Sequence, residues 1–128
     1  MSSAVLDASA LLALLNQEEG SDLVAELVAD GAAIGAVNLA EVATKLSQVG
    51  IPEEQIREII DTLGLEIIPF DAEQVYRAAL LVGPTRSVGL SLGDRACLAL
   101  AAQVGVPAVT ADRAWRQLEL DVKVRVVR

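Results

Sequence analysis

The chain has 128 residues, 53% of them hydrophobic, with 18 acidic residues against 10 basic ones, one cysteine and no histidine. This length and apolar content predict one domain, residues 1–128, with its own core. The net charge of −8 argues against non-specific binding to nucleic acid, which depends on Lys and Arg. The lack of histidine excludes a Ser-His-Asp triad, a Cys-His dyad and histidine-based cleavage of RNA.

Short apolar segments alternate with helical ones along the chain. Strands are expected at residues 4–7, 32–36, 65–69, 107–110 and 122–127, which are brief, apolar and rich in β-branched residues. Helices are expected at residues 8–17, 22–30, 38–49, 52–63, 71–82, 91–104 and 112–118, with a helical hairpin in the crossover between the second and third strands. The alternation predicts an α/β fold, a three-layer α/β/α sandwich around a mostly parallel sheet of about five short strands.

The compartment follows from the cysteine content and the amino terminus. Cys97 has no partner for an internal disulfide, and the apolar run before Asp7 is too short for a signal peptide. We therefore expect a cytoplasmic protein, with Cys97 as a small core residue.

Four acidic residues fall close to ends of the predicted strands or starts of the predicted helices: Asp7, Glu41, Asp94 and Asp112. In open parallel sheets, ligands bind beyond the carboxyl ends of the strands. Asp7 ends the first strand, Glu41 opens the helix after the second, and Asp112 follows the strand that ends at Thr110. Asp94 opens a helix elsewhere, so the fold must bring it to the same edge.

Each of these acids also has a structural explanation. Ser91 and Asp94, like Asn38 and Glu41, have the spacing of a helix capping box. Asp7 and Asp112 could cap the helices that follow them, although a charge at the end of a buried strand is costly unless it is paired or bound to metal.

Joint placement favours a chemical role for the acids. Carboxylates gathered at one edge repel one another unless some are protonated or a cation neutralises them. Mg²⁺ prefers such oxygen ligands, whereas the absence of histidine argues against a zinc site. There is no glycine-rich phosphate-binding motif either. Metal-assisted hydrolysis by carboxylates is therefore the enzymatic route that remains open.

Four segments resemble a known family: VLDASALLALL at residues 5–15, NLAEVATKL at 38–46, GLSLGDRACLALA at 89–101 and TADRAW at 110–115. In this order they resemble the PIN domain, and within it the VapC-type toxins of bacterial toxin–antitoxin pairs. The resemblance covers essentially the whole chain.

The resemblance implies a Mg²⁺- or Mn²⁺-dependent endoribonuclease. The residues that match the family's metal-binding and water-activating acids are Asp7, Glu41, Asp94 and Asp112, with Asp7, Asp94 and Asp112 as metal ligands and Glu41 acting on the water. Ser9 and Thr110 match the small polar residues of the same site. The resemblance also implies an RNA substrate, a VapB-type antitoxin as partner and a homodimer.

Several other side chains could contact substrate. Arg86, Arg95, Arg113 and Arg116 could hold RNA phosphates, or they could lie on a solvated face or pair with the acids. Lys45 could contact substrate or form an ordinary surface pair with Glu41. Trp115 could stack on a base, but large aromatic residues are more often buried.

Two other functions remain open at this stage. One is a receiver-like phospho-acceptor domain with Asp71 as the acceptor, Thr110 as the switch hydroxyl and Lys123 as the lysine. The other is a non-catalytic interaction module in which the acids are only caps and the apolar faces bind a partner. Separately from this alternative, the helices around residues 11–15 and 23–28 are expected to leave a groove for a partner such as the antitoxin.

Overall fold

A five-stranded parallel sheet forms the centre of the computed structural model, which describes residues 2–128. The strands are β1 (Val5–Leu6), β2 (Ala33–Gly35), β3 (Glu66–Ile68), β4 (Ala108–Thr110) and β5 (Val124–Val126). They lie in the order β3-β2-β1-β4-β5, and every neighbouring pair is parallel. The expectation of a mostly parallel sheet is therefore confirmed. The strands are only two or three residues long, shorter than the apolar runs that contain them.

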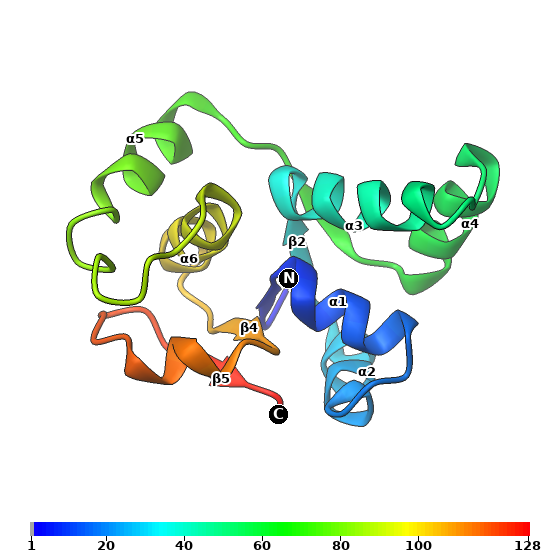
Figure 1. The fold of residues 1–128 in the computed structure, drawn as a ribbon, viewed down its shortest axis with the longest axis horizontal. Helices are drawn as coiled ribbons and strands as arrows, with labels where there is room; N and C mark the ends of the chain where they lie inside the picture. Colours follow the sequence, from blue (N-terminus) through cyan, green and yellow to red (C-terminus); the bar gives the residue numbers. More distant parts are fainter. Residues whose placement is uncertain (1) are drawn as a thin grey trace.

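Helices cover both faces of the sheet (Figure 1). They are α1 (Ala8–Leu15), α2 (Ser21–Asp30), α3 (Ala36–Gln48), α4 (Glu53–Leu63), α5 (Ala72–Leu80), α6 (Leu92–Val104) and the short 3₁₀ helix η1 (Arg113–Gln117). Alternate strand residues point to opposite faces. Leu6 packs among residues of α1 and α2, and Ile34 among residues of α1, α3 and α4, whereas Val5 packs with α6 and η1. This arrangement is the expected α/β/α sandwich.

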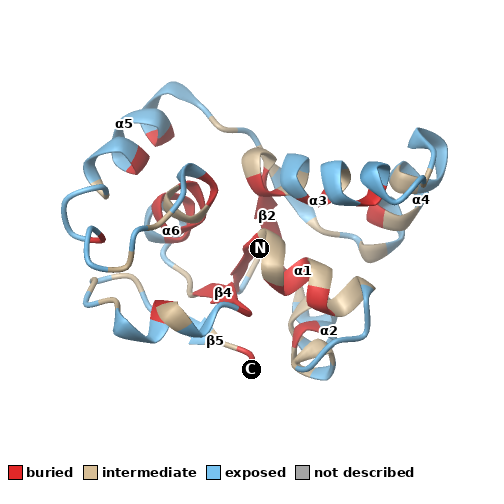
Figure 2. Ribbon diagram, in the orientation of Figure 1, coloured by how far each residue is buried: buried red, intermediate tan, exposed pale blue. Residues whose placement is uncertain are grey.

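Burial follows these layers (Figure 2). The central strands and α6 are buried, while α4 and α5 expose most of their residues. Trp115 is 1% exposed and Cys97 is fully buried, so both are core residues. No helix in the part of the chain that the structure describes is long and apolar enough to cross a membrane.

Strand β3 lies at the edge of the sheet, and its Glu66 and Ile67 are exposed. One expectation, at the start of α3, needs correction. Helix α3 begins at Ala36 after Gly35, so Asn38 lies inside the first turn and does not cap the helix. The capping box expected for Asn38 and Glu41 does not form, because the chain turns into a helix directly after β2.

Candidate active site at the carboxyl edge of the sheet

The candidate site lies where the strand order reverses. The chain moves from β1 outward to β2 and β3, and then crosses to the other side of β1 to form β4. Asp7 directly follows β1, and Thr110 is the last residue of β4. The backbone N–H of Asp7 donates to the carbonyl oxygen of Val109 at 2.9 Å, which fixes these two strand ends side by side. This topological switch point is the usual ligand-binding place in open α/β sheets.

Asp7 is buried, with 3% of its surface exposed, and it accepts three hydrogen bonds. The backbone N–H of Ala10 donates to its Oδ1 at 2.8 Å, so Asp7 caps α1. The hydroxyl of Ser9 donates to the same oxygen at 2.7 Å, and that of Thr110 donates to Oδ2 at 2.5 Å. Ser9 and Thr110, expected as supporting residues, therefore hold the Asp7 carboxylate directly.

Burial raises the pKa of Asp7 from 3.8 to about 6. The three hydrogen bonds lower the pKa and the negative charge of Asp94 raises it, but loss of water around the carboxylate outweighs them. Asp7 is thus a carboxylate whose ionised form the fold disfavours, and a bound cation would stabilise that form.

The other three acids come from separate segments and meet Asp7 at one hollow. This hollow of about 250 Å³ is lined by Asp7, Ala8, Ser9, Leu12, Glu41, Lys45, Asp94 and Asp112. Glu41 lies in the second turn of α3 and is exposed, Asp94 lies half-buried in the first turn of α6, and Asp112 is the exposed residue before η1. The fold therefore brings Asp94 to the edge where the other acids lie.

Asp94 and Asp112 cap helices and also line the acidic hollow. Asp94 forms a capping box: its Oδ2 accepts from the backbone N–H of Ser91 at 3.0 Å, and its own N–H donates to the Ser91 hydroxyl at 3.2 Å. Asp112 Oδ1 accepts from the backbone N–H of Ala114 at 2.9 Å. Each of these two carboxylates has a second oxygen that caps nothing, so a capping role does not exclude a ligand role.

Glu41 is held differently from the aspartates. The side-chain amide of Asn38 donates to Glu41 Oε1 at 3.0 Å, and it also donates to the carbonyl oxygen of Gly93 at 3.0 Å. Asn38 is 1% exposed, so this contact between α3 and α6 is buried beneath the hollow.

The donor set fits a hard divalent cation. All four acids offer oxygen ligands, which Mg²⁺ and Mn²⁺ prefer, and the one cysteine nearby is a buried thiol whose pKa burial raises well above its usual range. Within residues 2–128, no three acidic or cysteine side chains lie close enough together to enclose a metal ion as they stand. An ion held by one or two carboxylates with waters and a phosphate would suit this open arrangement.

Comparisons with known proteins show the family to which the chain belongs. The family described as the PIN domain matches residues 4–120. The chain belongs to the PIN domain family.

Solved structures with the same fold include three complexes. The first is a DNA-bound VapBC from Salmonella typhimurium, with a TM-score of 0.76 and 16% identity, covering 100% of both chains. The second is a toxin–antitoxin complex from Klebsiella pneumoniae, with a TM-score of 0.75 and 18% identity, covering 98% of both chains. The third is VapBC2 from Rickettsia felis bound to a promoter DNA fragment, with a TM-score of 0.72 and 20% identity, covering 94% of this chain and 96% of that one. A comparison with curated proteins finds no match.

The five basic residues that were expected to contact substrate divide by position. Lys45 lines the acidic hollow. Arg113 lines a neighbouring hollow with Ser9 and Asp112, where it pairs with Glu19 at 3.3 Å. The remaining three lie elsewhere: Arg95 donates to the Ala78 carbonyl at 2.9 Å, Arg116 donates to the Arg128 carbonyl, and Arg86 is exposed in the turn after α5.

The receiver-like alternative does not fit the PIN domain. Asp71 caps α5 beyond the edge strand β3, and its Oδ1 accepts from the backbone N–H of Gln74 at 2.9 Å. Two strands, β2 and β1, separate β3 from the strand that carries Thr110. Asp71 and Thr110 therefore do not share a site.

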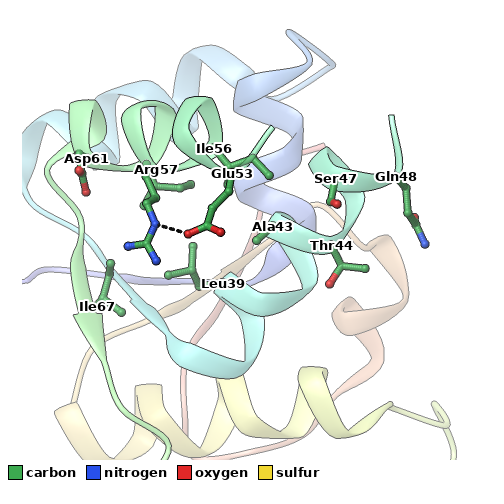
Figure 3. A pocket seen from close by; sticks show the side chains of 11 residues that line it. Leu39, Ala43, Thr44, Ser47, Gln48, Glu53, Ile56, Arg57, Asp61 and Ile67 are labelled. Carbon is green, nitrogen blue, oxygen red and sulfur yellow. Dashed lines mark hydrogen bonds and ion pairs between the residues drawn. The ribbon is translucent and has the colours of Figure 1, made fainter. Parts of the chain in front are cut away.

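A larger apolar hollow lies away from the acids, between α3 and α4 (Figure 3). Its volume is about 680 Å³, and its lining includes Leu39, Ile56, Ile60 and Ile67, with the Arg57–Glu53 ion pair beside them. The apolar sequences of α1 and α2 predict a groove at those helices instead. The apolar side chains of those helices, including Leu11, Val24 and Leu27, pack against the core.

Sequence reasoning missed two residues beside Glu41. Asn38 was interpreted as a cap, and Gly93 was given no role. A signal was present in Gly93, because glycine inside a helix is unfavourable by about 1 kcal/mol relative to alanine and so requires a local reason.

Proposed function

We propose that this PIN domain is a divalent-metal-dependent endoribonuclease that hydrolyses RNA phosphodiester bonds. Its active site is formed by Asp7, Glu41, Asp94 and Asp112. The observation that carries the proposal is that four carboxylates from four separate segments line one hollow at the switch point of the sheet. PIN domains are a nuclease family, which supports the reaction class.

The roles follow from position. Asp7, Asp94 and Asp112 would hold Mg²⁺ or Mn²⁺, and Ser9 and Thr110 orient Asp7 by their hydroxyl hydrogen bonds. When bound, the metal ion neutralises charge on the phosphate and lowers the pKa of bound water. Glu41 orients the attacking water or accepts its proton. With no histidine in the chain, a carboxylate is the natural general base here.

The test is cleavage of end-labelled structured RNAs by purified protein in Mn²⁺, in Mg²⁺ and in EDTA. The critical variant is Asp94→Asn, and the matched control is Asp71→Asn, because Asp71 is also a capping aspartate but lies away from the hollow. We expect metal-dependent cleavage by the wild type and the Asp71 variant, and none by the Asp94 variant. Equal cleavage by all three proteins would mean a contaminating nuclease and would contradict the assignment.

We also propose that the domain is the toxin of a toxin–antitoxin pair and binds a VapB-type antitoxin. The names of the structurally similar complexes support this role. The net charge of −8 favours a partner that presents Arg or Lys. Induced expression of the wild type should arrest growth of a bacterial host, whereas expression of the Asp94→Asn variant should not. Arrest by both proteins would contradict a toxic nuclease activity.

A homodimer is part of the same proposal. Val75, Tyr76 and Leu80 are exposed on α5, and an apolar surface of this kind favours association with a second copy. Light scattering should give a dimer for the wild type and a monomer for a Tyr76→Glu, Leu80→Glu variant. A monomeric wild type would contradict this part of the proposal.

A further inference from the structure

Glu41 is attached to α6 through a buried amide. The Nδ2 group of Asn38 donates to Glu41 Oε1 at 3.0 Å and to the Gly93 carbonyl oxygen at 3.0 Å, and Gly93 is 55 positions from Asn38 in the chain. An amide donor fixes the direction of a carboxylate without adding a positive charge beside it. Asn38 is buried, so its hydrogen bond to Gly93 is protected from competition by water, while its hydrogen bond to the exposed Glu41 is partly buried.

Gly93 makes the space that the Glu41 carboxylate occupies. A Cβ atom at position 93 would lie 2.5 Å from Glu41 Oε1, 2.6 Å from Oε2 and 2.7 Å from the carboxyl carbon. Gly93 lies in the first turn of α6 and is not among the positive-φ residues, so its backbone does not require glycine. A Cβ atom at position 93 would therefore displace the Glu41 carboxylate, which is the end of a flexible and exposed side chain, and would leave the backbone of α6 undisturbed.

The same turn also carries Asp94. Because Gly93 contacts the Glu41 carboxylate and the next residue is Asp94, the backbone of α6 sets the positions of both acids relative to each other. An unrestrained glutamate on an exposed helix surface would sample several rotamers. A restrained one is held toward the hollow that Asp7 and Asp94 share.

We propose that Asn38 and Gly93 are positioning residues that orient the Glu41 carboxylate toward the acidic hollow. Asn38 donates a hydrogen bond to the carboxylate and Gly93 leaves room for it; these two contacts together are called the seat of Glu41. This inference rests on the proposed function of Glu41 in RNA hydrolysis. Under this inference, Asn38 and Gly93, which are not acids of the site, determine where the Glu41 carboxylate lies relative to the other acids.

The test compares Gly93→Ala with Gly83→Ala. Position 83 is the matched control, because a Cβ atom there meets nothing within 4 Å and its φ is not positive. We expect Gly93→Ala to lower cleavage in saturating Mn²⁺ at least tenfold, with the thermal unfolding midpoint unchanged or raised. Gly83→Ala should cleave like the wild type. Cleavage by Gly93→Ala within twofold of the wild type would overturn the inference and leave the nuclease assignment intact.

A double-mutant cycle with Glu41 separates positioning from a general structural effect. If Gly93 acts through Glu41, Gly93→Ala should cause no further loss in a Glu41→Gln background. In addition, Glu41→Asp shortens the side chain by one methylene and relieves the overlap, so it should cost less in the Gly93→Ala protein than in the wild type. Independent, additive losses would contradict the proposed seat.

Crystal structures provide a readout that does not depend on activity. In Gly93→Ala, the Glu41 carboxylate should leave its place and lose the hydrogen bond to Asn38, while Asp94 and α6 stay where they are. A Glu41 carboxylate that stays in place would overturn the inference. If the wild type cleaves no RNA, the proposed function fails, and this structural result alone decides whether the seat exists. Asn38→Ala should release the carboxylate in the same way.

Discussion

Asp7 is a carboxyl group that the fold surrounds with neutral donors and apolar residues. Its hydrogen bonds come from two hydroxyls and one backbone N–H, and burial still raises its pKa to about 6. A raised pKa means that the folded protein binds a proton on Asp7 more tightly than the unfolded chain does. Stability therefore falls as the pH rises from about 4 through 6, and the full cost of the charge is present above that range.

Asp7→Asn should consequently stabilise the metal-free protein at pH 7.5. A shift from 3.8 to about 6 corresponds to roughly 3 kcal/mol at about 1.4 kcal/mol per pKa unit, and imperfect hydrogen bonding by the amide lowers the expected gain to about 1–3 kcal/mol. Urea unfolding in EDTA measures it. The difference should shrink at pH 4, where Asp7 is protonated in the folded wild type. A variant that is less stable than the wild type at pH 7.5 would contradict this account, and cleavage should be lost in either case.

The same carboxyl group predicts the pH dependence of cleavage. Because the ionised form is the one that can bind metal, kcat/KM should rise with pH up to about 6 and then level off. Metal and proton compete for Asp7, so raising the Mn²⁺ concentration should move the apparent pKa downward. The measurement is kcat/KM from pH 5 to pH 8 at two Mn²⁺ concentrations. A profile that is flat from pH 5 upward would show that Asp7 is not the titrating group.

The three aspartates of the candidate site lie at the amino-terminal ends of helices. Asp7 is the N-cap residue just before α1, Asp94 lies in the first turn of α6, and Asp112 precedes η1. Each accepts a hydrogen bond from at least one backbone N–H there. Free N–H groups and the helix dipole favour negative charge at these ends, so the fold lowers the cost of gathering carboxylates. Each of these aspartates can therefore cap a helix and also be a candidate metal ligand.

The Ser91→Ala variant separates helix capping at α6 from the proposed metal binding by Asp94. It removes the hydroxyl that accepts from the Asp94 N–H, while the Ser91 backbone N–H still donates to Asp94 Oδ2. We expect a loss of about 1 kcal/mol of stability, the usual value of an N-cap side chain, with cleavage kept within a few-fold of the wild type. Ser87→Ala, in an exposed turn, is the control. Loss of cleavage equal to that of Asp94→Asn would mean that the Ser91 hydroxyl itself has a role in the reaction.

The charge of the whole molecule limits how many basic residues are free to contact RNA in the proposed function. Four arginines form ion pairs with glutamates: Arg57 with Glu53, Arg77 with Glu73, Arg113 with Glu19, and Arg128 with Glu18. Lys45 is the basic residue that lines the acidic hollow. Under the proposed function, we therefore expect bound cations to contribute more than a basic surface to holding a phosphate.

A shallow salt dependence of RNA binding follows. Each phosphate contact with a basic residue on single-stranded RNA contributes about −0.7 to the slope of log K against log salt concentration. With one or two such contacts, we expect a slope of about −0.7 to −1.4 for the Glu41→Gln variant in Mn²⁺, measured by fluorescence anisotropy, because this variant should not cleave yet keeps the three proposed metal ligands. A slope steeper than about −3 would indicate an extended basic surface and contradict this view.

Metal binding should also stabilise the folded chain as a whole. An ion that binds only the native state adds about 2.7 kcal/mol at a concentration of 100 Kd. Thermal unfolding of the wild type should shift upward with Mn²⁺ and return in EDTA, and Asp71→Asn should behave in the same way. Asp7→Asn should lose most of the shift. An equal Mn²⁺ shift in the Asp7 variant would place the cation elsewhere.

Local patterns in the sequence were enough to predict the strands and helices. Apolar periodicity predicted the sequence of strands and helices, because the spacing of side chains within a helix or strand is a local property. Asp7, Asp94 and Asp112 were also visible locally, since each falls at a strand end or helix start. Confirmed details include the capping box of Ser91 and Asp94, the parallel sheet and the burial of Trp115 and Cys97.

Tertiary structure alone decided which residues meet. The order of strands made β3 an exposed edge, a distinction that a short apolar run cannot reveal. Asn38 fits a capping pattern in sequence, yet its amide instead joins Glu41 to the Gly93 carbonyl. The pairing of Arg113 with Glu19, 94 positions away, is equally invisible in the sequence. Contacts of this kind depend on how whole helices pack across the sheet, and no local spacing encodes that packing.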